Sequence, residues 1–500
     1  MKRTLNYVFN FWLRPVLGSF FTFHLFLFMF CNKTLPEGKS IDALPPIFPD
    51  YVGVTIPANI APLNFKITEE CEKVCVAFAY AGYQIIVYGN NGKIKIPVSD
   101  WKELLSEAAG QSISVDVYVM MKGEWLKYNP FSVIVAAEPM DPYIAYRLIE
   151  PGYTLWGQMG LYQRHLESYK QTAIIENKMT GNNCMNCHSF RMQDPSQMLF
   201  HSRETFPSTI VIKGDKAEKL NTKTDKTPSF LVYPSWHPEG RFVAFSVNVT
   251  QQAFHMNHRN RVEVFDEESD VVIYDTETHE VFTSPLLFSK DRWETFPTFS
   301  PDGKTLYFCS AEPYPIVEFE KIKYSLFSVS FDPSTRSFGS SVDTLYNAVT
   351  EGGSVSFPRV SPDGKYLLYT LSGYGNFSIW HKDADLYIYD LEDKTSRALD
   401  EVNSNDVDSY HSWSSNSRWF VFSSRRIDGL YTRPYFAYID EQGRAGKPFL
   451  LPQKDADYYH ELMKSYNIPE FIKGKVNHSQ FDLSRQIKND RGIDVKFVGW

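Results

Sequence analysis

Hydrophobic and polar positions alternate in short runs through most of this chain, and the runs recur as a repeated hairpin. Four segments start at residues 233, 296, 357 and 410, and each holds a short strand that opens on an aromatic residue, a turn and a second apolar strand. The starts are 63, 61 and 53 residues apart, with third and fourth strands between them. Such units are typical of four-stranded blades with loop insertions, so the pattern predicts an all-β fold with a β-propeller.

Two weaker copies precede these four. Residues 187–190 align with 410–413, residues 194–196 take the place of the turn, and 198–201 follow as a second strand. A further copy begins at 139 and leads into an apolar run from Tyr143 to Arg147. The chain therefore predicts a six-bladed propeller over residues 139–452.

The Pro-Asp-Gly hairpins at 301–303 and 362–364 resemble the repeats of TolB-type proteins, which are six-bladed propellers of the bacterial periplasm. The resemblance covers about residues 140–450. It implies the fold much more than a function, because propellers host binding, electron transfer and hydrolysis alike.

Short alternating strands also predict a small β-sandwich of immunoglobulin-like size over residues 62–138. The expected strands are Asn64–Ile67, Val74–Ala79, Gln84–Tyr88, Ser114–Met120 and Phe131–Ala136. Residues 32–61, which are rich in proline, are expected to be a linker. The tail, residues 453–500, is expected to carry a helix at about 458–466 and no blade.

The first 31 residues have the pattern of a targeting segment. Lys2 and Arg3 are followed by an apolar run from Val16 to Phe30, and Cys31 comes next. The run is shorter than the ~20 residues that span a bilayer. A lipoprotein anchor with lipidated Cys31, an uncleaved membrane anchor and a secreted protein all remain open, because Phe30 is bulky where a small residue is usual. All three place the chain outside the cytoplasm, and the expected location is the periplasmic side of the bacterial cell envelope, with the lipoprotein anchor as the first choice.

The motif Cys184-Met185-Asn186-Cys187-His188 is the clearest indication of chemistry. Cys-x-x-Cys-His is the attachment motif of c-type haem, in which both thiols bond to the porphyrin and the histidine binds the iron. We therefore expect one covalent haem c held by Cys184 and Cys187, with His188 as the proximal ligand. A zinc site and a redox dithiol are the alternatives.

A second axial ligand would come from residues near the motif. His201 is the first choice, because it ends the strand expected to pair with the strand of His188. The alternatives are His411, His255, His258 and Met198. The repeat alignment places His188 and the long insertions near 252–258 and 374–381 at the same mouth of the propeller channel.

The other cysteines indicate less. Cys71 and Cys75 could form a disulfide only if a tight turn brought them together, and Cys309 has the pattern of a core strand residue.

These features favour an envelope-anchored electron carrier or redox sensor over an enzyme. Its expected partners are a redox or envelope protein and, through the N-terminal anchor, the membrane. The net charge of −8 and the absence of basic runs argue against nucleic acid. Two alternatives remain: a propeller that binds proteins without a redox role, and a haem enzyme of the peroxidase or small-oxyanion reductase type.

Overall fold

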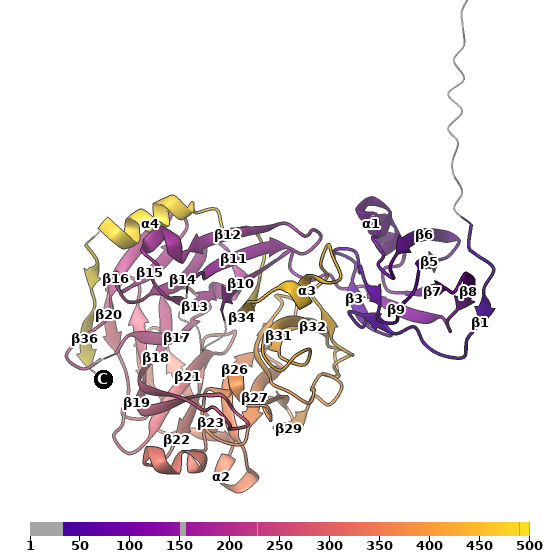
Figure 1. Cartoon of the computed structure of the whole chain (residues 1–500). Helices are drawn as coiled ribbons and strands as arrows, with labels where there is room; N and C mark the ends of the chain where they lie inside the picture. The colour runs from indigo at the N-terminus through magenta and orange to yellow at the C-terminus, as the bar shows by residue number, and fades with distance from the viewer. Residues whose placement is uncertain (1–33, 151–156, 228, 490, 500) are drawn as a thin grey trace, which may run out of the picture. The chain divides into compact units, whose positions relative to one another are not determined.

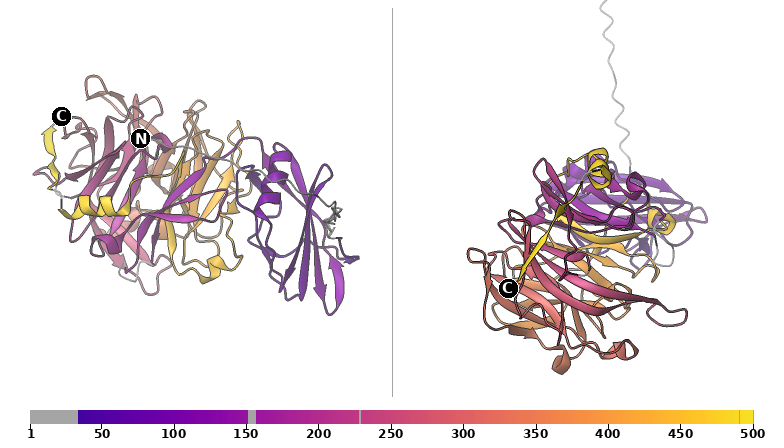
Figure 2. Two further views of the ribbon diagram at one scale, coloured as in Figure 1. Left: turned by 90° about the horizontal axis from the view of Figure 1, so that it is seen from above. Right: turned by 90° about the vertical axis from the view of Figure 1, so that its left-hand side faces the viewer.

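The computed structural model describes residues 34–150, 157–227, 229–489 and 491–499. Six β-sheets of four or five strands each stand around a common axis and form a six-bladed propeller (Figures 1 and 2). The predicted propeller and its number of blades are confirmed. The targeting segment predicted at 1–31, including Cys31, lies outside the described residues. No described helix is both long and apolar enough to cross a bilayer.

The strands of each blade are given from the axis outward. Blade 1 consists of β34 (Ser465–Ile472), β10 (Tyr143–Ile149), β11 (Gly160–His165) and β12 (Gln171–Glu176). Blade 2 consists of β13 (Met185–Phe190), β14 (Gln197–Ser202), β15 (Ser208–Lys213) and β16 (Lys216–Asn221). Blade 3 consists of β17 (Leu231–Trp236), β18 (Phe242–Phe254), β19 (Val262–Asp275) and β20 (Glu280–Phe282).

The remaining blades follow the same order. Blade 4 consists of β21 (Trp293–Phe299), β22 (Thr305–Ala311) and β23 (Ser325–Asp332), with β24 (Ser337–Phe338) and β25 (Asp343–Tyr346) both paired to β23. Blade 5 consists of β26 (Ser354–Val360), β27 (Tyr366–Ser372), β28 (Asp385–Asp390) and β29 (Thr395–Ala398). Blade 6 consists of β30 (Asp408–Trp413), β31 (Trp419–Ser424), β32 (Arg433–Tyr438) and β33 (Phe449–Leu450).

The tail closes the ring, which corrects the sequence-based expectation for residues 453–500. The expected helix is a single turn, α3 (Tyr458–Glu461), and the innermost strand of blade 1, β34, follows it. β34 pairs antiparallel with β10, more than 300 residues earlier. Beyond it, α4 (Gln480–Asn489) leads to β35 (Ile493–Asp494) and β36 (Lys496–Gly499), which add parallel outer strands to blades 2 and 3.

Every innermost strand carries the same bulge. One residue in each has a positive φ of 48–54°, and the strand register shifts at that point. These residues are Cys187, Tyr233, Phe296, Phe357, Tyr410 and Ile468. Proline follows in four blades, which suits a position without a ladder hydrogen bond. In blades 2 and 6 the following residue is instead His188 or His411.

Aromatic residues at the bulge fill the axis of the propeller. The ring centroids of Tyr233 and Phe296 are 4.4 Å apart, as are those of Phe296 and Phe357, and Tyr410 lies 4.5 Å from Phe357. Each contact joins one blade to the next. The aromatic residue that opens the sequence repeat therefore packs the centre of the molecule.

The N-terminal domain is built mainly from one seven-stranded sheet. Its strands are β1 (Lys39–Ser40), β3 (Thr55–Pro57), β5 (Lys73–Tyr80), β6 (Tyr83–Asn90), β7 (Ser112–Met121), β8 (Glu124–Lys127) and β9 (Phe131–Ala136). β2 (Ile47–Phe48) and β4 (Lys66–Ile67) form a separate pair, and α1 (Val98–Glu107) buries Trp101, Leu104 and Leu105.

Two expectations for this region are corrected. Residues 32–61 are not a bare linker, because β1 and β3 pair in parallel with β8 and β9. An immunoglobulin-like topology is not confirmed, since seven strands belong to one sheet and a helix packs in the core. No disulfide joins Cys71 to Cys75, which lies in the extended strand β5. Cys309 is fully buried in β22, as expected of a core residue.

Candidate functional site

The Cys-x-x-Cys-His motif enters the propeller at the start of blade 2. Cys184 immediately precedes β13, and Cys187 and His188 form the bulge of that strand. Asn186 pairs with His201 on β14 and Ser189 pairs with Leu199, so the two bulge residues between them have no cross-strand partner. Cys187 and His188 therefore lie outside the regular pairing between β13 and β14.

Both motif cysteines are free thiols, and each is only 8% exposed. Cys184 packs in an apolar cluster with Met159 and Leu161. Burial raises the pKa of its thiol, although Arg147 and Arg203 act in the opposite direction. Cys187 instead lines a cavity on the propeller axis. The two thiols are three positions apart in the sequence and therefore lie in different surroundings, one in the apolar cluster and one at the axial cavity.

The imidazole of His188 is buried and, among the described residues, neither ring nitrogen makes a hydrogen bond. Burial lowers its pKa to about 3, the positive charge of Arg147 contributes, and the backbone at Ile468 offsets part of the shift. His188 is thus neutral at physiological pH. Neutral imidazole is the form that binds metals, and an unpaired buried nitrogen calls for an explanation such as a ligand.

The axial cavity has a volume of about 30 Å³ and lies between His188 of blade 2 and His411 of blade 6. His411 is also buried, with both nitrogens unpaired within the described residues, and burial lowers its pKa to about 3. Glu470 of blade 1 lines the cavity too, and its Oε2 lies 3.9 Å from Nε2 of His188. Burial raises the pKa of Glu470 to about 8, against the opposing influence of Arg359.

The donor atoms fit a covalent haem, but the described cavity does not. Two free thiols and an unpaired neutral imidazole meet the chemical requirement. A cavity of about 30 Å³ has room for about two water molecules, whereas sites for drug-sized ligands measure about 300–1,000 Å³. Attachment of a porphyrin would therefore require the side chains around residues 184–188 to separate. In the described part of the chain, no three His, Cys, Asp or Glu side chains are grouped as metal ligands.

The five residues that the sequence offers as a second iron ligand lie in different parts of the propeller. Nδ1 of His201 lies 2.8 Å from Oγ1 of Thr209, and its ring packs 6.1 Å from Phe245 of blade 3. Met198, on the same strand, faces the other side and packs in the cluster of Cys184. Of the five candidates, only His411 lines the axial cavity with His188.

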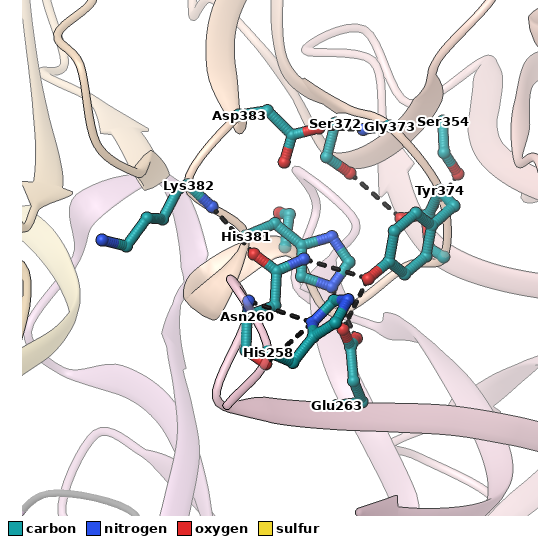
Figure 3. A network of polar contacts seen from close by, with 12 residues as sticks. His258, Asn260, Glu263, Ser354, Ser372, Gly373, Tyr374, His381, Lys382 and Asp383 are labelled. Atoms are coloured by element: carbon teal, nitrogen blue, oxygen red, sulfur yellow. Dashed lines mark hydrogen bonds and ion pairs between the residues drawn. The ribbon is translucent and has the colours of Figure 1, made fainter. Parts of the chain in front are cut away.

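His255 and His258 lie at the end of an arm formed by the long strands β18 and β19. Figure 3 shows His258 and its polar contacts. Nδ1 of His258 bonds to the backbone of Asn260, whose side chain donates to the Tyr374 hydroxyl at 3.0 Å. Tyr374 in turn donates to Glu263. These contacts attach the arm to the loop 373–384 of blade 5.

The long insertions gather at one mouth, as predicted, but His188 does not line that mouth and lies in the axial cavity instead. A hollow of about 140 Å³ at this end is lined by Gln252 and Val262 of the arm, by Trp380 of blade 5 and by Arg425 of blade 6. We name it the loop mouth. Arg425 is buried, and its guanidinium packs against the Trp380 ring, 3.4 Å from the ring centroid.

Sequence reasoning missed two channel residues, Arg359 and Glu470. Each occupies the second position after the bulge residue, where the other blades carry Ser189, Ser235, Thr298 or Ser412. A signal for Glu470 was present, since Ile468-Pro469-Glu470-Phe471 has the same form as Phe296-Pro297-Thr298-Phe299. It was missed because no turn and second strand follow it in the chain.

Comparisons with known proteins give structural likenesses alone. No family model and no curated protein sequence matches the chain. Among solved structures, a TolB-type protein from Agrobacterium tumefaciens is 14% identical with a TM-score of 0.37, covering 63% of this chain and 89% of that one. An oligogalacturonate lyase from Vibrio parahaemolyticus is 12% identical, with a TM-score of 0.31 and coverage of 57% and 84%.

Prolyl oligopeptidase B from Galerina marginata is 12% identical, with a TM-score of 0.36, and the match covers 62% of this chain and 44% of that one. These likenesses concern the fold, and the assignment of six blades rests on the sheets themselves.

Proposed function

We propose that the protein is an envelope haem protein that carries one haem c bonded to Cys184 and Cys187, with His188 as the proximal iron ligand. The observation that carries the proposal is the neutral, buried imidazole of His188, which has no hydrogen bond within the described residues and directly follows two free thiols. A structural core histidine would be expected to pair at least one nitrogen.

When bound, haem supplies one-electron exchange at iron. Cys184 and Cys187 would hold it to the chain, and His188, in the bulge of β13, would bind its iron. Burial keeps His188 unprotonated and excludes bulk water from the axis. Electron transfer or redox sensing with an envelope protein docked on the propeller is the function that suits a single haem.

We propose that His411, rather than His201, would be the second residue to hold the iron. His411 lines the cavity of His188, whereas His201 does not, although Nε2 of His201 is also buried with no hydrogen bond in the described chain.

The location follows from the first 31 residues. The basic start, the apolar run and Cys31 support a periplasmic lipoprotein anchored in the membrane. Incorporation of labelled palmitate that is lost in Cys31→Ser tests the anchor separately from the haem.

Haem staining on a denaturing gel is the decisive experiment. The full chain would be produced in a bacterial host that matures c-type cytochromes, next to the double variant Cys184→Ser/Cys187→Ser. Cys71→Ser serves as a matched control, because Cys71 is a buried free cysteine outside the propeller. We expect a stained band for the wild type and the control and none for the double variant.

A colourless wild type would contradict the haem proposal and leave a propeller that binds proteins without a redox role. High-spin iron that binds cyanide or peroxide would instead favour an enzyme of the peroxidase or small-oxyanion reductase type.

A further inference from the structure

The tip of the blade 3 arm carries side chains that the haem proposal does not use. The arm is the hairpin of β18 and β19, and residues 255–261 connect its two strands. The connection reads His255-Met256-Asn257-His258-Arg259-Asn260-Arg261. Two imidazoles and one thioether thus fall within four consecutive residues. Nitrogen and sulfur ligands of these kinds bind transition metal ions.

The two histidine rings lie side by side. The ring centroids of His255 and His258 are 5.1 Å apart, and the ring planes are inclined by 47°. Two imidazoles that bind one metal ion tetrahedrally, each through a nitrogen at about 2.1 Å, place their ring centroids about 5 Å apart. The pair therefore already has the ring spacing of a shared metal site.

Each ring has a nitrogen available for a metal ion. Nε2 of His255 is buried and makes no hydrogen bond within the described residues. Nδ1 of His258 lies 3.1 Å from both the carbonyl oxygen and the amide nitrogen of Asn260 (Figure 3). A proton on this Nδ1 can be donated to the carbonyl, which leaves Nε2 of His258 with its lone pair. A backbone carbonyl bonded to the second ring nitrogen is a common support of a metal-binding histidine.

The backbone beneath the two rings is held in place. The amide of His255 donates to the carbonyl of Arg261 at 2.9 Å, which closes the connection between the strands. Asn260 is 3% exposed, and its side chain donates to the Tyr374 hydroxyl at 3.0 Å and accepts from the amide of Lys382 at 3.2 Å. These bonds attach the tip to blade 5. Ligands on such a fixed backbone lose less conformational freedom on binding than those of a mobile loop.

Met256 and its neighbours decide which metal suits the tip. Met256 follows His255 and is 97% exposed, so its three rotatable side-chain bonds allow the sulfur to turn toward the two rings. A thioether is a soft ligand, which selects copper(I). Arg259 and Arg261 are exposed in the same connection, and their charges repel a divalent cation more strongly than a monovalent one.

We propose that the tip of the arm binds one copper(I) ion through Nε2 of His255, Nε2 of His258 and the sulfur of Met256. Three ligands at an exposed tip leave the ion open to exchange with other molecules. The inference is independent of the haem proposal, because neither histidine lines the axial cavity of His188.

Anaerobic competition for copper(I) with the chromogenic chelator bicinchoninate tests the proposal. The parent protein is the full chain with Cys184→Ser/Cys187→Ser, so that the motif thiols cannot bind the ion. The remaining described cysteines, Cys71, Cys75 and Cys309, are buried and stay the same in every variant. We expect the parent to withdraw one equivalent of copper(I) from the chelator. A parent that withdraws none overturns the proposal.

His255→Ala and His258→Ala should each weaken copper(I) binding at least tenfold, because each removes one ligand. His478→Ala is the matched control, since His478 lies in the exposed tail outside the arm and should bind as the parent does. Unchanged binding in His255→Ala or His258→Ala contradicts the assignment. If the parent fails to fold, the same three substitutions in the wild-type chain give the comparison as a difference.

Met256→Leu keeps the side-chain volume and removes the thioether. It should weaken copper(I) binding at least tenfold, and it should leave binding of Zn²⁺ to the two histidines, measured in parallel, as in the parent. Copper(I) binding that Met256→Leu does not change would overturn the choice of copper(I). Because the parent cannot attach haem, a failure of this test leaves the haem proposal standing, and a colourless wild type leaves this test intact.

Discussion

His188 and His411 occupy the same position in the innermost strands of blades 2 and 6, where the other four blades carry proline, and both line one axial cavity. Proline suits this bulge because it has no N–H to leave unpaired. In blades 2 and 6 a histidine replaces the proline. Its imidazole is neutral, lies on the axis and makes no hydrogen bond within the described residues. The pair therefore marks a departure from the repeat that packing alone does not account for.

If both imidazoles bind iron, their removal should have distinct spectroscopic effects. We expect His411→Ala to convert a low-spin, six-coordinate spectrum into a high-spin one that binds cyanide, because it removes the second ligand. His201→Ala should leave the visible spectrum unchanged, since His201 does not line the cavity of His188. Met198→Leu is the volume-matched control. The reverse pattern, with His201→Ala high-spin and His411→Ala unaffected, would return the ligand role to His201.

Local signals in the sequence were enough to predict the inner hairpins of five blades, and long-range pairing explains what they missed. The hairpins at 233, 296, 357 and 410 carry aromatic bulge, turn and second strand within about 13 residues. β34 has the same bulge at Ile468, but its partner β10 lies more than 300 residues earlier. The repeat count of six was right because β10 was recognised, although its innermost neighbour was not.

The candidate site divides in the same way. The motif residues Cys184, Cys187 and His188 are adjacent in sequence and were found. Of the facing residues, His411 was named as a candidate ligand, whereas Glu470 and Arg359 were missed. The three come from other blades, and only the closed ring brings them to the axis. Burial, which sets the pKa of these groups, is likewise a property of the assembled propeller.

The closure strand gives a truncation test of this architecture. A chain that ends at Gly474 keeps β34 and should fold, at reduced stability because the buried Leu483 and Ile487 of α4 are lost. A chain that ends at Lys464 lacks β34, leaves the edge of β10 unpaired and should not give a cooperative thermal transition. Far-UV circular dichroism with thermal melting distinguishes the two. Equal melting of both chains would show that closure by β34 is dispensable.

Because of Asp266, the free energy of unfolding should decrease as the pH rises from about 4 to about 6. This side chain is 5% exposed, and burial raises its pKa to about 6, despite hydrogen bonds from Asn248, Tyr324 and Asn376. In the unfolded chain its pKa is about 3.9. Between about pH 4 and 6 the unfolded state therefore releases the proton first, and the free energy of unfolding decreases by up to about 3 kcal/mol.

Melting temperatures at pH 4.5 and 6.5 measure this effect. Asp266→Asn should narrow the difference between the two values, whereas Asp332→Asn on an exposed turn should leave it as in the wild type. An undiminished difference in Asp266→Asn would assign the pH dependence to other groups.

The arm of blade 3 is held by a buried contact between a histidine and a carboxylate. Nε2 of His381 lies 2.7 Å from Oε2 of Glu263, with side-chain exposures of 1% and 2%. Burial disfavours the ionised Glu263, but hydrogen bonds from His381, Tyr374 and Asn260 outweigh it and lower the pKa of this carboxyl. Removal of His381 takes one hydrogen-bond donor from a buried carboxylate, which is destabilising because a buried charged group depends on its hydrogen bonds.

We therefore expect His381→Ala to loosen the arm, with faster amide hydrogen exchange in residues 249–266, while exchange in blades 1 and 6 stays as in the wild type. His381→Gln keeps a donor for Glu263 and should have a smaller effect. His478→Ala, at an exposed site in the tail, is the control. Unchanged exchange in the arm of His381→Ala would mean that Tyr374 and Asn260 hold Glu263 without the histidine, and that the arm is fixed by strand pairing alone.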